Sequence, residues 1–97
     1  MPSKYLLYSA FPNPFNNTTT ICLDLPEDSY LELSIYDIDG HEIWNYNNCK
    51  SCKYPAGYYS VDWDGNNKYG EIVPTGIYFV TMKTPSYLKT VKILFVK

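Results

Sequence analysis

Turn-forming residues recur about every 8–14 residues along this chain, and this spacing limits what the chain can fold into. The segments between the turns are too short for the long helices of a bundle, and most of them alternate apolar and polar side chains. A series of short segments of this kind is typical of antiparallel sandwiches. The spacing of the turns therefore predicts a compact all-β domain.

The composition also favours strands over helices. The 97 residues include two alanines and neither arginine nor glutamine, so the best helix formers are scarce. Aromatic side chains make up 18% of the chain, and these fit a pleated, half-buried surface. Because a chain of this length encloses one core of modest size, residues 1–97 are expected to form a single domain.

The pattern predicts a seven-stranded antiparallel β-sandwich of the immunoglobulin-like or fibronectin-like kind. Alternation is clearest in residues 18–25, where Ile21, Leu23 and Leu25 are expected to face the core. Residues 77–82 and 91–96 are apolar on both faces, which favours central or covered strands. Residues 45–55 are expected to form the least regular loop. The seven strands are expected at residues 4–10, 18–25, 30–38, 41–48, 57–64, 77–84 and 87–97.

Charge and hydropathy exclude two classes of partner. The net charge is −2 and the lysines are scattered, whereas nucleic acids require a basic stripe that replaces their counterions. No apolar run approaches the roughly 20 residues of a membrane helix, so membrane insertion is not expected. The start of the chain also lacks the pattern of a secretory signal. The chain is therefore expected to be either a cytoplasmic protein or a piece of a longer chain.

Three cysteines make an odd count, so at least one thiol is free or paired between molecules. Cys49 and Cys52 have C-x-x-C spacing, which we interpret as an incidental loop pair that can close a short disulfide. A metal site and a redox pair are the alternatives. A zinc site needs four ligands, and only Cys22 and His41 could complete it.

Catalytic chemistry has little support, and we predict that the chain is not an enzyme and binds no cofactor or metal. The single histidine, His41, follows a turn and has no nucleophile beside it in the sequence. Residues 62–67 begin like a calcium loop, but Asn67 and Val73 stand where an EF-hand needs glycine and glutamate. Trp44, Tyr58 and Tyr69 are expected to point outward, where aromatic rings could stack on a sugar.

Six segments in a fixed order carry the most specific signal. They are residues 11–21 (FPNPFNNTTTI), 25–27 (LPE), 35–43 (IYDIDGHEI), 55–65 (PAGYYSVDWDG), 73–79 (VPTGIYF) and 91–97 (VKILFVK). This order closely resembles the type A C-terminal sorting domains of the bacterial type IX (Por) secretion system. It is equally similar to the immunoglobulin-like domain family named after the flagellar hook-capping protein. Two departures are Asn17, where a third proline is common, and His41, where a basic residue is usual.

The resemblance implies a sorting signal at the C-terminus of a larger secreted protein. Such a tail is linked to an upstream cargo domain, crosses the periplasm, docks on an outer-membrane translocon and can be cleaved by a surface sortase. A passive immunoglobulin-like spacer and a carbohydrate-binding accessory module are the alternatives. The expected recognition surface includes the Asp39–Gly40 turn and the end of the chain, where strand addition is one way to dock. In that terminal segment it comprises Lys92, Ile93, Leu94, Phe95, Val96 and Lys97.

Overall fold

The computed structural model describes residues 2–46, 49 and 52–97, and these form eight strands. None of the described residues belongs to a helix long and apolar enough to cross a membrane. The strands are β1 (Leu6–Leu7), β2 (Thr19–Leu25), β3 (Ser29–Tyr36), β4 (Glu42–Asn45), β5 (Cys52–Tyr54), β6 (Gly57–Trp63), β7 (Gly76–Thr84) and β8 (Tyr87–Phe95).

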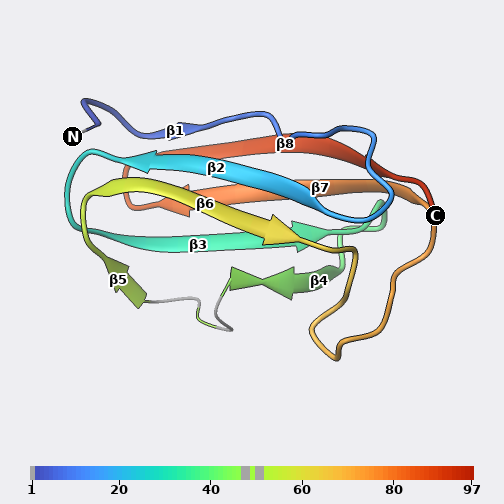
Figure 1. The fold of residues 1–97 in the computed structure, drawn as a ribbon. Helices are drawn as coiled ribbons and strands as arrows, with labels where there is room; N and C mark the ends of the chain where they lie inside the picture. Colours follow the sequence, from blue (N-terminus) through green and yellow to red (C-terminus); the bar gives the residue numbers. More distant parts are fainter. Residues whose placement is uncertain (1, 47–48, 50–51) are drawn as a thin grey trace.

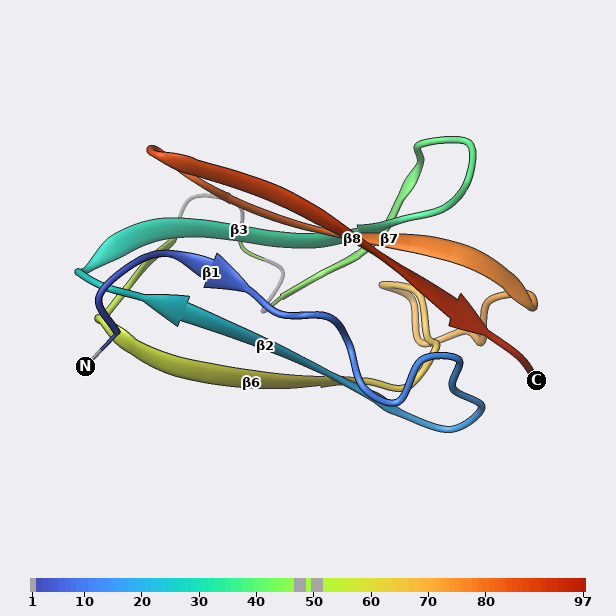
Figure 2. The same cartoon turned by 90° about the horizontal axis from the view of Figure 1, so that it is seen from above.

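The strands form two antiparallel sheets that pack face to face (Figures 1 and 2). The smaller sheet has the order β1-β2-β6, and the larger has the order β4-β3-β7-β8, with β5 also paired to β3. Each sheet turns one face to the other and one to solvent, which explains the alternating pattern in the sequence. The expected all-β sandwich is confirmed.

The core lies between the sheets, and alternation predicted its main contributors. Ile21, Leu23 and Leu25 of β2 are at most 1% exposed, so their predicted inward orientation is confirmed. Trp63 at the end of β6 is buried in this core and contacts other aromatic rings. Its ring contacts are Phe15, Tyr78 and Phe95, with centroids 5.5–6.4 Å away.

The strand count of seven was wrong, because the expected irregular loop contains β5. Residues Cys52–Tyr54 pair with Ser29–Leu31 at the start of β3, while β4 pairs with the far end of the same strand. Two short strands thus share one side of β3. The first strand is also shorter than expected, although Phe11 still exchanges backbone hydrogen bonds with Thr20.

The two apolar strands near the end of the chain occupy different positions. β7 lies between β3 and β8, which confirms its expected central place. β8 lies at the edge of the larger sheet, and Lys92 on its outer side is exposed, as is Val96 just after the strand. The expectation of a central or doubly covered strand is therefore wrong for β8. Its apolar character comes from its inward side chains, Ile93 and Phe95, which are buried in the core.

Candidate functional site

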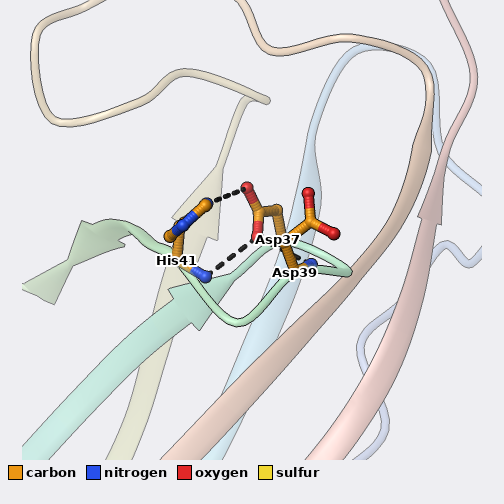
Figure 3. Close-up of side chains that lie close together, drawn as sticks. All are labelled: Asp37, Asp39 and His41. Carbon is orange, nitrogen blue, oxygen red and sulfur yellow. Dashed lines mark hydrogen bonds and ion pairs between the residues drawn. The ribbon is translucent and has the colours of Figure 1, made fainter.

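The turn between β3 and β4 is organised by Asp37 (Figure 3). Its Oδ1 atom accepts hydrogen bonds from the backbone N–H groups of Asp39, at 3.0 Å, and His41, at 2.9 Å. The N–H of Gly40 donates to the carbonyl of Asp37, and Gly40 has a φ of +86°, which glycine adopts without strain. Asp39 and Gly40 were the residues predicted from the sequence, whereas the organising residue is Asp37. An aspartate that caps its own turn is a known local signal.

The two N–H donors hold Asp37 in its charged form. The hydrogen bond from the His41 N–H lowers the carboxyl pKa, and this effect outweighs the opposing desolvation. Asp37, Asp39 and His41 are also the described residues that could hold a metal, with ligand atoms within 4.8 Å of one another. However, the Asp37 carboxylate already binds the turn, and the His41 side chain is 78% exposed. The geometry of this cluster is accounted for by the turn itself.

A second turn, in the loop between β6 and β7, has the same hydrogen-bond scheme. Asn67 Oδ1 accepts from the N–H groups of Tyr69, at 2.9 Å, and Glu71, at 3.0 Å. The N–H of Gly70 donates to the Asn67 carbonyl, and Gly70 has a φ of +81°. The loop is tied to β4 because the N–H of Lys68 donates to the Ile43 carbonyl at 2.7 Å. We call these two segments, Asp37–His41 and Asn67–Glu71, the twin turns.

The twin turns border a cleft of about 600 Å³, which we call the turn cleft. Three exposed isoleucines line it: Ile38 is 71% exposed, Ile72 61% and Ile77 37%. Among the described residues of its lining, two are charged, and both are acids: Asp37 and Glu71. The full lining is Asp37, Ile38, Ile43, Asn67, Glu71, Ile72, Val73, Pro74, Thr75, Gly76, Ile77 and Tyr78. Asp39 and Gly40, which the sequence predicted as recognition residues, belong to the twin turn whose Asp37 and Ile38 line the cleft, whereas the cleft itself was not predicted.

The predicted recognition residues at the end of the chain divide into two groups. Ile93 and Phe95 are at most 2% exposed and belong to the core. Lys92, Val96 and Lys97 are exposed, and Leu94 is half-buried. A partner could therefore contact the outward side chains of this segment, whereas its inward side chains hold the sandwich together.

The outer edge of β8, the one not paired with β7, is covered by residues 13–15 along this terminal segment. Asn13 lies between Pro12 and Pro14, and its side chain donates to the Lys92 carbonyl and accepts from the Leu94 N–H, both at 2.9 Å. The Leu94 carbonyl accepts from the Phe15 N–H at 3.0 Å, and the Phe15 carbonyl accepts from the Val96 N–H at 2.9 Å. A partner strand cannot add to β8 here unless residues 13–15 move away.

The three aromatic residues expected to face a ligand are not brought together. Trp44 is half-buried and packs against the core, which corrects its expected outward position. Tyr58 and Tyr69 are 69% and 78% exposed, but Tyr58 lies near the start of β6 and Tyr69 lies in the loop after that strand. A ligand role for these residues stays a prediction.

Tyr58 instead shares the outer face of the smaller sheet with residues that sequence reasoning missed. Tyr58 lies opposite Asp24 of β2, and Asp24 accepts a 2.6 Å hydrogen bond from the Tyr8 hydroxyl. This bond raises the pKa of Tyr8. A hollow of about 430 Å³ lies beside Tyr8. It is lined by Tyr8, Ser9, Phe11, Thr20 and Cys22.

The cysteines follow the first interpretation made from the sequence. Cys49 and Cys52 form a disulfide, which confirms the loop pair, and residues 50–51 between them lie outside the described part. Cys22 is free and half-buried on β2. In the segment that begins like a calcium loop, Asp62 accepts a 2.9 Å hydrogen bond from the Thr20 hydroxyl, and Trp63 is buried in the core.

Comparison with known proteins settles the family. A family model described as "FlgD Ig-like domain" matches residues 13–86. The chain belongs to this family. The resemblance to the immunoglobulin-like family named after the flagellar hook-capping protein and the expected Ig-like sandwich are thereby confirmed together. A search of curated proteins gives no significant match.

Two solved structures from Porphyromonas gingivalis contain the same fold as this Ig-like domain. The structure of dimeric latent PorU matches 95% of the chain with a TM-score of 0.66 and 21% identity. The structure of PorZ, described as an essential bacterial surface component of the type-IX secretion system, matches 94% with a TM-score of 0.63 and 18% identity. The matched region is 9% of the PorU chain and 11% of the PorZ chain. At this level of identity the likeness establishes the fold.

Proposed function

We propose that this domain is a non-catalytic module that the type IX secretion machinery recognises as the sorting signal of a larger exported protein. The observation that carries the proposal is the fold that the domain shares with part of PorZ, a surface component of that system. In this proposal the module is joined to an upstream cargo and passes through the periplasm. Its partners are the outer-membrane translocon and a surface sortase, and its destination is the cell surface.

The structure supports a recognition surface at one end of the sandwich. The end of the chain and the β3–β4 turn lie at the same end of the molecule (Figures 1 and 2). Lys97 is anchored there because its N–H donates to the Thr75 hydroxyl at 3.0 Å. Lys92 and Lys97 are exposed, so a receptor could contact these charges without disturbing the core.

An export assay tests the sorting role. A reporter with an N-terminal export signal is fused in front of the domain and expressed in a bacterium with an active type IX system. We expect the reporter at the cell surface, and in the periplasm of an isogenic strain that lacks the translocon. Equal surface display in both strains would contradict the sorting role and favour a passive spacer. Surface-exposed protein is measured by protease accessibility on intact cells.

Substitutions test the recognition residues better than a truncation. Deleting residues 92–97 would remove Ile93 and Phe95 from the core, so lost export would only report unfolding. Lys92→Glu with Lys97→Glu reverses two exposed charges and leaves the core intact. The matched control is Lys83→Glu with Lys89→Glu, which reverses two exposed charges elsewhere on the larger sheet. Export lost only with the first pair would support Lys92 and Lys97, and equal export would exclude them.

One observation favours carbohydrate binding as a second candidate function. Tyr8 and Phe11 are exposed and line a hollow whose polar groups come from Ser9 and Thr20. The exposed Tyr58 lies opposite Asp24 of β2, which accepts the hydrogen bond from Tyr8. Aromatic faces with nearby polar groups suit sugar rings. Retardation in polysaccharide gels that is lost in Tyr58→Ala and kept in Tyr69→Ala would support this candidate. Equal migration of the unchanged domain in gels with and without polysaccharide would exclude it.

A further inference from the structure

The turn cleft gathers aliphatic side chains that a small soluble domain would ordinarily bury. Ile38 follows the first residue of one twin turn, Ile72 follows the last residue of the other, and Ile77 is the second residue of β7. All three line one cleft, and each is at least 37% exposed. Exposed aliphatic side chains scattered singly are ordinary, whereas a contiguous group on a concave surface indicates an interaction site.

The cleft is held open by hydrogen bonds on each side. Each twin turn is closed by a side-chain acceptor, and the loop is fixed to β4 by the bond from Lys68 to Ile43. The Val73 N–H also donates to the Gly65 carbonyl at 2.8 Å, which holds the next part of the same loop. The lining is therefore preformed, and a ligand would not have to order it first.

The charged residues around the cleft limit which kinds of ligand it can bind. Asp37 and Glu71 lie in the lining, and Asp39 lies in the same turn as Asp37. The nearby Lys68 is engaged elsewhere, because its Nζ lies 3.9 Å from Glu42 Oε1. An acidic border around aliphatic side chains repels phosphate groups and anionic lipid and attracts lysine or arginine.

We propose that the turn cleft binds a segment of a partner protein in which aliphatic residues are flanked by lysine or arginine. The aliphatic side chains of the segment pack against Ile38, Ile72 and Ile77. Its basic groups pair with Asp37, Asp39 and Glu71. The inference rests on the lining of the cleft and does not depend on the route by which the domain is exported.

A second copy of this chain is a less suitable occupant. Its most basic and aliphatic segment is residues 91–97, yet Ile93 and Phe95 in that segment are buried in their own sandwich. The segment is also held by residues 13–15 along its edge. The occupant is therefore expected to come from a different protein.

Peptide titration tests the proposal. The probe is a short fluorescein-labelled peptide in which lysines alternate with isoleucine and leucine, and binding is followed by fluorescence anisotropy. Two control peptides replace all lysines with glutamate or all aliphatic residues with serine. We expect saturable binding of the first peptide, weakened by salt, and at least about tenfold weaker binding of each control. No saturable binding of the first peptide, or equal binding of all three, would overturn the proposal.

Variants locate the binding on the molecule. Ile72→Ser removes an exposed aliphatic contact and is expected to weaken binding about tenfold. Glu71→Lys reverses a charge in the lining and should weaken binding by a similar factor that shrinks at high salt. The control is Tyr58→Ser, an exposed position on the other sheet that should bind like the unchanged domain. Equal binding by the cleft variants, once circular dichroism shows them folded, would place the peptide elsewhere.

Two further readouts separate this inference from its alternatives. Self-association in sedimentation experiments that disappears in Ile72→Ser would show that a second copy fills the cleft, and would overturn the proposed partner. Surface export and peptide binding are also measured side by side for the unchanged domain and for Ile72→Ser. Peptide binding without surface export would refute the sorting role alone, and export without peptide binding would refute the cleft proposal alone.

Discussion

The twin turns use the same backbone geometry with different chemical groups. In both, the first residue accepts hydrogen bonds from the N–H groups two and four residues later, and the fourth residue is a glycine with positive φ. The acceptor is a carboxylate at Asp37 and a neutral amide at Asn67. The turn geometry itself therefore needs no charge. The charge at Asp37 is available for a second role, such as the electrostatic attraction proposed for the turn cleft.

The turns also differ in how the rest of the fold supports them. The Asp37 turn joins β3 and β4, which are paired on both sides of it. The Asn67 turn lies in a long loop that is supported by separate single contacts. They are an isolated bridge between Asn66 and Ile72, backbone hydrogen bonds from Lys68 to Ile43 and from Val73 to Gly65, and a bond from the Trp63 indole to the Asn66 carbonyl. The loop turn is thus expected to depend more on its own side-chain acceptor than the hairpin turn does.

Substituting the two acceptor residues, Asn67 and Asp37, is expected to change stability most. It also tests whether the loop turn depends more on its acceptor than the hairpin turn does. Asn67→Ala leaves the N–H groups of Tyr69 and Glu71 without their acceptor, so we expect a loss of about 1–2 kcal/mol in the free energy of unfolding. Asp37→Ala should also be destabilising at neutral pH, because two N–H groups lose their acceptor. Urea denaturation measures both changes.

Hydrogen exchange shows whether the loop turn loosens as a unit. In Asn67→Ala the N–H of Lys68, which bonds to Ile43, should exchange faster than in the unchanged domain. In Asp37→Ala the same N–H should keep its protection, which makes this variant the matched control. Equal loss of protection in both variants would mean that the two turns do not open independently.

The glycines of the twin turns provide a second, smaller test of their equivalence. Gly40→Ala and Gly70→Ala both place a side chain at positive φ, and a Cβ at either position would meet no described atom within 4 Å. The cost is therefore conformational strain alone, about 1 kcal/mol at each position. Thermal denaturation should show similar losses for the two variants. A loss at one glycine only would contradict the shared geometry.

The sequence predicted most of the sandwich because its strong strands repeat one local pattern. In β2, β3 and β6 the apolar residues alternate, and this pattern requires no knowledge of the partner strand. β5 was missed because three residues are too few to show a period, and its pairing with β3 is a long-range contact. The edge position of β8 was missed because strand order also depends on long-range contacts, that is, on which strands meet in space.

The turns that border the cleft could be predicted from the sequence, but the cleft between them could not. Asp39 followed by Gly40 is a short-range hairpin signal that depends on local backbone preference. The glycines at 65 and 70 also indicate a turn after the strand at residues 57–64, but the acceptor role of Asn67 does not follow from them. The contact of their loop with β4 depends on a hydrogen bond between residues 25 positions apart, Lys68 and Ile43. The sequence therefore indicated the two turns but not the aliphatic cleft that they border.

Lowering the pH should weaken the Asp37 turn but not the Asn67 turn, and of the predicted changes in stability this is expected to be the smallest. Because its bonds with the N–H groups lower the folded-state pKa of Asp37, its ionisation stabilises the domain at pH values above the ordinary pKa of an aspartate. This contribution should disappear as the pH falls through that value and then through the lowered pKa. Asp37→Asn keeps an acceptor oxygen but cannot ionise, so its difference in stability from the unchanged domain should be larger at pH 7 than at pH 3.

The matched control for this pH series is Asp39→Asn. It removes a carboxylate of the same turn whose side chain, among the described hydrogen bonds, accepts none from the backbone. Urea midpoints across the pH range should converge for Asp37→Asn and the unchanged domain, while the Asp39→Asn difference should vary less. An NMR titration of the Asp37 carboxyl gives the shift directly. If Asp37 titrates like an unstructured aspartate, its two hydrogen bonds do not favour the charged form. A carboxylate and a neutral amide would then serve equally well as the acceptor in this turn geometry.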